Sequence, residues 1–508
     1  MTHTYLYLTL AVLCVLPVCL LVFQPQWLAK GVWFGALLLA VFFATSFKAP
    51  SELKYVVFGG AVVLALPVAL TLLVDRWLIR WMVLAGMLLP VVVFDATAVN
   101  FFSFEAYKGT SRGMEISVIY LVAVLLLGVF FLLKGKISLA PEWGSRLYLL
   151  YFLFSLPSLA KADNPLFSWF ELWKMMMVYL VFLAVYAYLE YSHGDFDVFL
   201  LGAGILAAVN FFLLVRQHLQ WRYQLSGFFP HQNSMAMFMS VGGALLLSCY
   251  VNGMGEEGRR RRWWFLLGCC LASFAVFRAF SRGAAGCYPI GLLMTSGVSL
   301  FFAFSPRKVG LLALLAVIGA VGMLYMAPKL FERFATANPV SWETRVALKN
   351  TAMRWIREDP LCGVGLNNWS THGSSLPVSE RKRNNDWNGE GIVETIYLLV
   401  AAECGLPCFF ALLLWFGYYL WVCLRLMARL RNSQYFCLPA GLLGGLVSVY
   451  LQSALEWVLK QQINFIWLMI FFAMLSYLDT HWVELVAKER AVRDGESENA
   501  LAVSEAAV

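Results

Sequence analysis

The chain has 508 residues, of which 61% are hydrophobic and only 13% are charged. Soluble domains carry about 45–50% apolar and about 25% charged residues. With a mean hydropathy of +0.72, the chain lacks the polar side chains that cover a water-exposed surface, which excludes soluble globular, disordered and fibrous classes. The net charge of +8 is not gathered in a basic low-complexity arm, so we expect no nucleic-acid partner. The composition predicts a polytopic membrane protein.

The hydropathy pattern predicts an all-α fold, a transmembrane helical bundle of about 12–15 spans at about 20 apolar residues per span. Candidate spans lie at 5–24, 29–47, 55–74, 78–98, 115–133, 146–160, 168–190, 198–215, 233–251, 263–280, 283–304, 309–327, 392–424 (broken or tilted), 435–456 and 462–480. The first run lacks a basic segment and a small-residue cleavage site, which indicates a retained helix rather than a signal peptide.

The loops divide the chain into five regions. We expect N-terminal spans (1–160), central spans with arginine-bearing loops (161–327), one large loop (328–391), C-terminal spans (392–482) and a disordered cytoplasmic tail (483–508). Ten of the eleven cysteines lie in or beside apolar runs, and Cys362 alone lies in a long hydrophilic stretch. This distribution indicates neither a disulfide framework nor a metal site.

Basic clusters give the orientation of the second half of the chain. They lie in alternate short loops, at Arg259–Arg262, at Arg307–Lys308, and at Arg425, Arg429 and Arg431. Under the positive-inside rule these loops face the cytoplasm. The outward-facing loops are then 216–232, the turn at 281–283, the large loop 328–391 and the turn around Lys460.

The large loop contains a predicted amphipathic helix at residues 342–358, WETRVALKNTAMRWIRE, with Ser341 as its cap. Arg345 and Lys349 are four residues apart and share one face of this helix. Pro360 and the following GVG end the helix and turn the chain. The helix is therefore a candidate cover for a site at the outward membrane surface.

Charged side chains in or beside membrane spans are costly, and they usually face a bundle interior or an aqueous cavity. Four outward places carry such residues: Arg222, His231 and Asn233 in RYQLSGFFPHQN; Arg278 and Arg282 in RAFSRGAAG; Arg345 on the loop helix; and Glu394 and Glu403 in VETIYLLVAAECGLPC. Each place also has a purely structural interpretation. In the same order, these are an interfacial turn, arginines that snorkel to the membrane surface, a solvated helix face, and a glutamate that complements a helix dipole. The helix-dipole interpretation does not apply to Glu403, because Glu403 lies inside an apolar run.

Together these features predict an arginine-rich cavity with carboxylates at its rim. Arginine binds phosphate oxygens bidentately, so the expected ligand is an anionic lipid and the expected reaction is the departure of a diphosphate. No Ser-His-Asp arrangement, P-loop, GxGxxG or His/Cys metal spacing is present, so we expect no metal and no cofactor. The alternatives are a transporter of anionic or lipid-linked substrates, which also uses such cavities, and a non-catalytic scaffold.

Four segments resemble the O-antigen ligase/polymerase (Wzy-like) superfamily of bacterial envelope glycosyltransferases: GFFPHQNSMAMF, FSRGAAG, ETRVALKNTAMRWIREDPLCGVGLNNW and AAECGLPC, within about residues 165–480. The resemblance implies a multi-pass bacterial inner-membrane protein that takes glycan from an undecaprenyl-diphosphate-linked donor at the periplasmic face. Its pathway would be O-antigen (lipopolysaccharide) or exopolysaccharide assembly. The acceptor would be a growing glycan in a polymerase or lipid A–core in an O-antigen ligase, and membrane lipid and other polysaccharide-assembly proteins would be further partners.

The resemblance also implies residue roles in an inverting, metal-independent transferase. Arg282 and Arg345 would bind the diphosphate and stabilise the leaving group, and Glu394 would deprotonate or orient the acceptor hydroxyl. Substrate binding would involve Arg222, His231, Asn233, Arg278 and Lys349.

One position departs from the family pattern. Ligases have His-Asn at the start of the helix after the large loop, then nine residues and Gly-x-x-Gly. Here Glu394-Thr395 stands in that place, Gly405 follows ten positions after Thr395, and Cys408 replaces the last glycine. A carboxylate can still accept a proton. The departure favours a polymerase or a divergent exopolysaccharide enzyme over a ligase.

Overall fold

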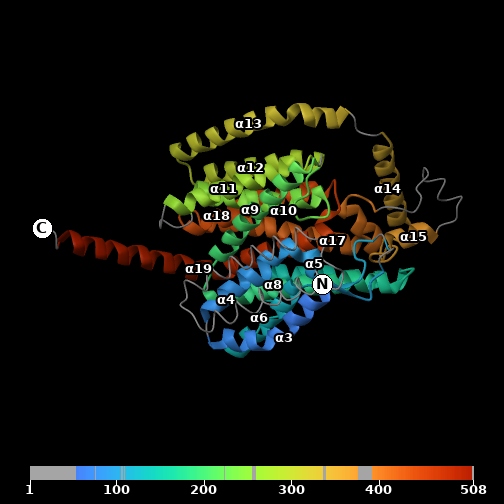
Figure 1. Cartoon of the computed structure of the whole chain (residues 1–508), viewed down its shortest axis with the longest axis horizontal. Coiled ribbons are helices and arrows are strands. Elements are labelled where there is room, and N and C mark those ends of the chain that lie inside the picture. The colour runs from blue at the N-terminus through green and yellow to red at the C-terminus, as the bar shows by residue number, and fades with distance from the viewer. Residues whose placement is uncertain are drawn as a thin grey trace, which may run out of the picture. The chain divides into compact units, whose positions relative to one another are not determined.

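The computed structural model describes residues 53–74, 76–104, 107, 109–221, 224–253, 259–335, 339–375 and 392–505 (Figure 1). The predicted spans at 5–24 and 29–47 lie outside these residues. The described fold is all-α apart from one two-stranded sheet of β1 (Val99–Phe101) and β2 (Met114–Ile116). The chain forms two compact units, one of residues 1–99 and 116–122 and one of residues 100–115 and 123–508.

The first unit contains α3 (Leu53–Val74), α4 (Arg76–Met82) and α5 (Phe94–Thr97). A π-helical turn (η1, Val83–Leu88) and a 3-10 turn (η2, Leu89–Val93) join the last two helices. The predicted span at 78–98 is therefore an interrupted helix. Pro90, near the start of the 3-10 turn, has no backbone N–H to continue the α-helical pattern.

The later helices are α6 (Val118–Lys134), α7 (Trp143–Ser155), α8 (Pro165–Ser192), α9 (Asp197–Leu219), α10 (Gln232–Asn252), α11 (Arg259–Arg278), α12 (Arg282–Phe302), α13 (Pro306–Ala335), α14 (Pro339–Glu358), α15 (Trp369–Ser375), α17 (Ile396–Arg429), α18 (Cys437–Ser453) and α19 (Gln462–Glu505). Three 3-10 turns join them: η3 (Leu156–Lys161), η4 (Gln434–Phe436) and η5 (Val458–Lys460). All of these helices and turns belong to the second unit, except for residues 118–122 at the start of α6, which belong to the first unit.

Seven of the described helices are long and apolar enough to cross a membrane: α8, α9, α10, α12, α17, α18 with the turn before it, and α19. Shorter apolar helices lie at Trp77–Val93, Val118–Lys134, Trp263–Arg278 and Lys308–Val317. The protein is thus a multi-pass membrane protein, as its composition predicts. The predicted span at 146–160 is the 13-residue α7 followed directly by the 3-10 turn η3, so only part of it is α-helical.

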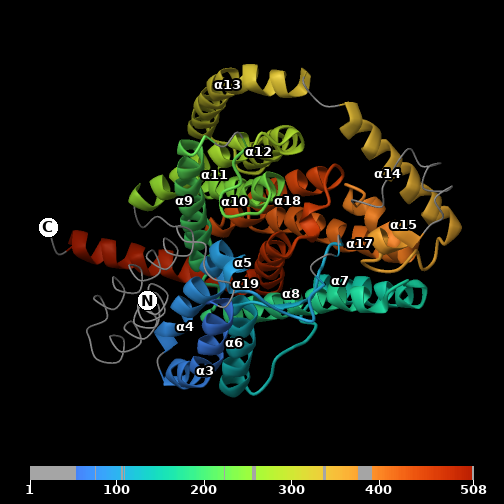
Figure 2. The same ribbon diagram turned by 45° about the vertical axis from the view of Figure 1, so that its right-hand side comes forward.

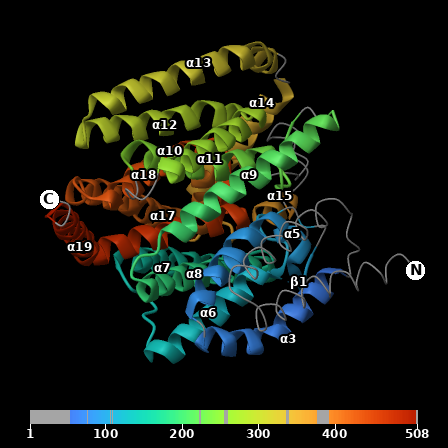
Figure 3. The ribbon, with the colours of Figure 1, turned by 60° about the vertical axis from the view of Figure 1, so that its left-hand side comes forward.

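Helix α10 packs against α18, α11 and α12, while α11 also packs against α9 (Figure 3). Glycines of α18 allow the close contact with α10. A Cβ atom on Gly441 would lie 2.6 Å from Leu245 Cα, and one on Gly445 would lie 2.9 Å from Val241 Cα. Small residues bring membrane helices together in this way because backbone contacts replace side-chain contacts.

Helix α13 lies beside α12, and α14 leads from there towards α15 and α17 (Figure 2). The predicted loop helix at 342–358 is confirmed, but α14 is described from Pro339 onwards. Ser341 therefore lies inside the helix, and its prediction as the cap is wrong. Helix α19 continues to Glu505, through the segment that we expected to be a disordered tail.

Candidate functional site

An apolar face of α14 packs on the start of α17. Leu348, Ala352 and Trp355 follow the helical repeat, and they share a buried cluster with Val364, Trp369, Ile392, Val393, Leu399 and Ala402. Arg345 lies three residues before Leu348 and therefore on the same face. The packing of α14 thus brings Arg345 to the residues that precede α17.

Arg345 and Glu394 form an ion pair across this contact. Arg345 Nη2 lies 2.5 Å from Glu394 Oε2, and both side chains are about one-third exposed, at 33% and 35%. A guanidinium group carries five N–H donors. Within the described part of the chain, the Nε of Arg345 donates no hydrogen bond. The pair therefore leaves donors of Arg345 for a further anionic partner.

Arg282 is the first residue of α12, after the cap residue Ser281. Its side chain is half-buried. Its positive charge lowers the pKa of both Glu394 and Glu456, which places it in the electrostatic field of the same cluster. Glu456 lies on the link between α18 and η5 and is only 8% exposed.

The carboxylates of Glu394 and Glu456 differ in their surroundings. Burial raises the pKa of Glu394 above its ordinary value, and the charges of Arg345 and then Arg282 oppose this effect. Burial raises the pKa of Glu456 to about 7, and the negative charge of Glu394 adds to the rise. A hydrogen bond from the Asn233 side chain and the charges of Arg345 and Arg282 lower it in part.

We define the outer cluster as Arg282, Arg345, Glu394 and Glu456. Its members come from four separate segments at the end of the bundle that the positive-inside rule predicts to face outward. Two cations beside two acids give a site that can bind an oxyanion and accept a proton.

The other predicted site residues are placed around this cluster. His231 caps α10, because its Nδ1 accepts a hydrogen bond of 3.2 Å from Asn233 N. Asn233 accepts a hydrogen bond at its backbone O from Gln452 Nε2 at 3.4 Å, and its side chain lowers the pKa of Glu456. Arg278 instead contacts His218 of α9, with Nη2 2.9 Å from Nδ1. Lys349 is exposed on α14.

Arg222 lies outside the described residues, as do Asp386 and Glu390, two further acids of the large loop. Within the described residues, no three His, Cys, Asp or Glu side chains are grouped so that they could hold a metal ion.

Helix α17 is kinked below the outer cluster, as the predicted broken or tilted span suggests. Gly405 has φ 79° and ψ 172°, a left-handed conformation that suits glycine. Pro407 has no N–H, and Leu406 N donates to Pro360 O at 2.7 Å instead of within the helix. The carbonyl oxygens of the preceding turn are therefore free to bind another segment.

The segment GVGLNNW fills this kink. Val364 N donates to Ala402 O and Gly365 N to Glu403 O, each at 2.9 Å. A Cβ atom on Gly363 would lie 2.5 Å from Ala402 O, so the close approach requires glycine. The family-like motif of the large loop thus binds the backbone of α17.

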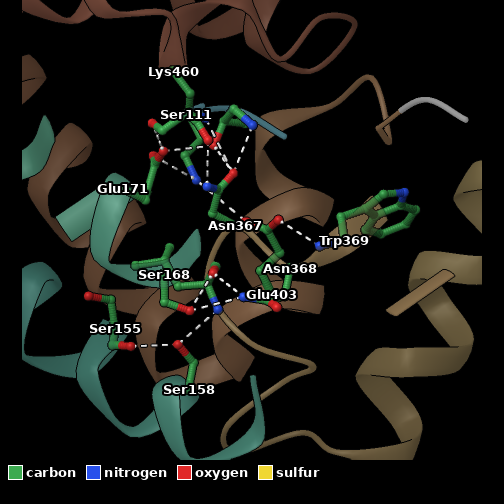
Figure 4. A network of polar contacts seen from close by, with 12 residues as sticks. Ser111, Ser155, Ser158, Ser168, Glu171, Asn367, Asn368, Trp369, Glu403 and Lys460 are labelled. Carbon is green, nitrogen blue, oxygen red and sulfur yellow. Dashed lines mark hydrogen bonds and ion pairs between the residues drawn. The ribbon is translucent and has the colours of Figure 1, made fainter. Parts of the chain in front are cut away.

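Two asparagines extend this anchor to α8 (Figure 4). Asn367 Nδ2 donates to Ser111 O at 2.9 Å and to Phe167 O at 2.8 Å. Asn368 Nδ2 donates to Ser168 Oγ at 3.0 Å. All three hydrogen bonds are buried, which makes them costly to break.

A buried ionic network lies next to this anchor (Figure 4). Glu171 Oε2 lies 2.7 Å from Lys174 Nζ, and Glu171 Oε1 lies 3.2 Å from Lys460 Nζ. Lys460 Nζ is also 3.6 Å from Glu403 Oε2, and Lys174 Nζ donates to Lys460 O at 2.8 Å. Two carboxylates and two lysine cations thus neutralise one another, and buried charges are stable only when they are paired in this way.

The network fixes the link that carries Glu456. Burial alone would lower the pKa of Lys460, but the charges of Glu171 and Glu403 raise it above its ordinary value. Lys460 therefore remains a cation. Because η5 ends at Lys460, four residues after Glu456, these ion pairs hold the link between α18 and α19 in place.

Glu456, Glu171 and Lys174 are functional or structural candidates that the sequence reasoning missed. Glu456 is an acid on a loop already assigned to the outward side. Glu171 and Lys174 are charges inside a predicted span, which is a rare and informative feature. Glu403 was identified by that feature, and it is buried as expected, at 1% exposure.

The comparisons with known proteins agree with the sequence resemblance. Residues 267–413 match the family model Wzy_C, described as O-Antigen ligase. No curated protein matches the chain. The matched segment contains Arg282, Arg345 and Glu394. Over these residues the chain is therefore similar to the O-antigen ligase family, whose members are membrane glycosyltransferases of the O-antigen ligase or polymerase type.

Proposed function

We propose that the protein transfers glycan from an undecaprenyl-diphosphate-linked donor to an acceptor hydroxyl at the periplasmic face of the bacterial inner membrane. The observation that carries the proposal is the ion pair of Arg345 with Glu394 in the electrostatic field of Arg282. Three segments of the O-antigen ligase domain supply these residues, and a lipid-linked diphosphate is the anion that such a site at a membrane surface suits.

Arg282 and Arg345 bind oxygens of the diphosphate. The acceptor oxygen attacks the anomeric carbon, the bond from that carbon to the phosphate oxygen breaks, and the diphosphate leaves with the electron pair. The two arginines stabilise the developing negative charge. Direct attack by the acceptor inverts the anomeric configuration, and the arginines take the charge-neutralising role without a metal ion.

Glu394 faces both the leaving group and the acceptor in this scheme. Its ion pair with Arg345 orients the guanidinium group, and its second oxygen can accept a hydrogen bond from the acceptor hydroxyl or take its proton. Asn233, His231, Arg278, Arg222 and Lys349 are proposed to contact the glycan or the lipid diphosphate around the cluster.

The acceptor is proposed to be a growing glycan, as in a polymerase, because Glu394-Thr395 stands where ligases have His-Asn. Transfer to lipid A–core is the second candidate. An assay with the same lipid-linked donor and either acceptor separates the two, since a polymerase lengthens the glycan and a ligase extends only lipid A–core.

Arg345→Ala tests the site itself. We expect at least a 100-fold loss of transfer by purified protein supplied with a lipid-linked glycan, because one oxyanion-stabilising donor contributes about 10²–10³ in rate. Arg357→Ala is the matched control, since Arg357 is an exposed arginine in the last turn of the same helix. Equal activity of the two variants would contradict the role of Arg345 and favour a scaffold.

A further inference from the structure

Glu456 differs from Glu394 in its ionic surroundings within the described part of the chain. Among the described residues, no lysine or arginine lies within ion-pair distance of Glu456, whereas Glu394 is held by Arg345 at 2.5 Å. The neutral side chain of Asn233 is among the groups that influence the pKa of Glu456. Glu456 is nevertheless buried, with only 8% of its surface exposed. A buried carboxylate without a bound cation readily takes up a proton.

The position of Glu456 is fixed from both sides. On one side Gln452, four residues before Glu456, donates from its Nε2 to Asn233 O at the start of α10 at 3.4 Å. On the other side Lys460 is anchored by Glu171 in the buried network (Figure 4). A proton acceptor must be held at the reacting hydroxyl, and these contacts meet that requirement.

We propose that Glu456 is the residue that removes the proton from the acceptor hydroxyl, while Glu394 positions Arg345 and the acceptor. The inference rests on the proposed function. The acceptor oxygen forms its bond to the anomeric carbon as its proton passes to a Glu456 carboxylate oxygen, and the diphosphate departs with the electrons of the broken carbon–oxygen bond. Glu456 then releases the proton to water.

The charges facing Glu456 give the direction of its pH dependence. Glu394 before α17 disfavours ionisation of Glu456, and Arg345 of α14 and Arg282 of α12 favour it. The resulting pKa is about 7, near the pH at which a general base works best. Only the ionised form accepts a proton, so transfer rises as pH increases through about 7 and falls as pH decreases through it.

Rates of transfer against pH for Glu456→Gln and Glu394→Gln test the assignment. We expect Glu456→Gln to lose at least 100-fold, since a general base contributes about 10²–10⁴, and to lose the fall in rate below pH 7. Glu394→Gln should be slower but keep that fall. Glu358→Gln, at an exposed acid of α14, is the control and should match the wild type.

A second readout does not depend on activity. Infrared difference spectra between pH 5 and pH 9 should contain the carbonyl stretch of one protonated carboxyl group that titrates near 7. This band should be absent in Glu456→Gln and present in Glu394→Gln. Circular dichroism and thermal unfolding in detergent identify a variant that fails to fold, and Glu456→Asp, which keeps a carboxylate, should retain the band.

The outcomes separate the two claims. An active wild type with an equally active Glu456→Gln, or a titrating band that disappears only in Glu394→Gln, would overturn the role of Glu456 and leave the transferase intact. A wild type that releases no diphosphate from any lipid-linked glycan would overturn the proposed function, and the proton-transfer role with it.

Discussion

Arg345 and Lys349 lie on one face of α14 by sequence spacing, yet only Arg345 contacts an acid of the described structure. The difference arises because Leu348, Ala352 and Trp355 bury the part of this face that includes Arg345. Sequence spacing predicts the shared face, and the family resemblance singled out Glu394. Neither predicts Glu456, because the approach of the α18–α19 link to α14 is a tertiary contact.

Arg345→Lys separates charge from geometry at this site. Lysine keeps the positive charge but lacks the planar fork that binds two oxygens at once. We expect transfer to fall at least tenfold, with the thermal stability of the protein unchanged. A lysine variant as active as the wild type would show that a point charge at this position is sufficient.

Lys460→Met tests the buried network at the level of one residue. It leaves Glu171 and Glu403 with only Lys174 to balance them, and breaking a buried ion pair costs about 3–5 kcal/mol. We expect a loss of this size in the free energy of unfolding in mixed micelles. Lys488→Met, at an exposed lysine of α19, should change it by less than about 0.5 kcal/mol. Similar values for both variants would contradict the structural role.

At the scale of elements, the spans were predictable because apolar runs of the required length are visible in the sequence. The kink of α17 was predictable only as a broken or tilted span. Its location at Gly405 depends on the hydrogen bond from Leu406 N to Pro360 O, and that partner is more than forty residues away by the numbering. From the sequence, the glycines of the family-like GVGLNNW segment are predicted to turn the chain, whereas in the structure the segment also anchors α17.

Gly405→Ala tests this anchor. The backbone has φ 79°, and a Cβ atom would lie 2.9 Å from Cys362 N. We expect a lower unfolding temperature and faster proteolysis between α14 and α15, because a positive φ with an extended ψ is essentially restricted to glycine and costs other residues about 1–3 kcal/mol. The contact adds to that cost. Gly417→Ala, in the same helix with no atom within 4 Å of its Cβ position, should be neutral or stabilising. Equal proteolysis of the two variants would argue against the anchor.

For the whole molecule, composition predicts the multi-pass class, and the basic loops predict which end of the second half faces outward. Two predicted spans are not single regular helices: 146–160 is an α-helix that ends in a 3-10 turn, and 78–98 is interrupted. Hydropathy does not reveal such breaks, since π and 3-10 turns use the same apolar residues as an α-helix.

Thiol labelling tests the orientation. In a variant that keeps only Cys362 of the eleven cysteines, a membrane-impermeant maleimide should react from the outside of spheroplasts, since Cys362 is partly exposed at the outward end. A cysteine introduced by Arg431→Cys should react only in inside-out vesicles. The reverse pattern would contradict the predicted topology and place the outer cluster in the cytoplasm.

The most direct test of the transferase is the fate of a lipid-linked glycan supplied to purified protein in liposomes, with EDTA present. We predict that free undecaprenyl diphosphate appears in equal amount to the glycan transferred, that the new linkage has the inverted configuration, and that Arg345→Ala abolishes both products. Glycan that crosses the bilayer while still attached to its lipid, with no release of diphosphate, would contradict the transferase and identify a carrier.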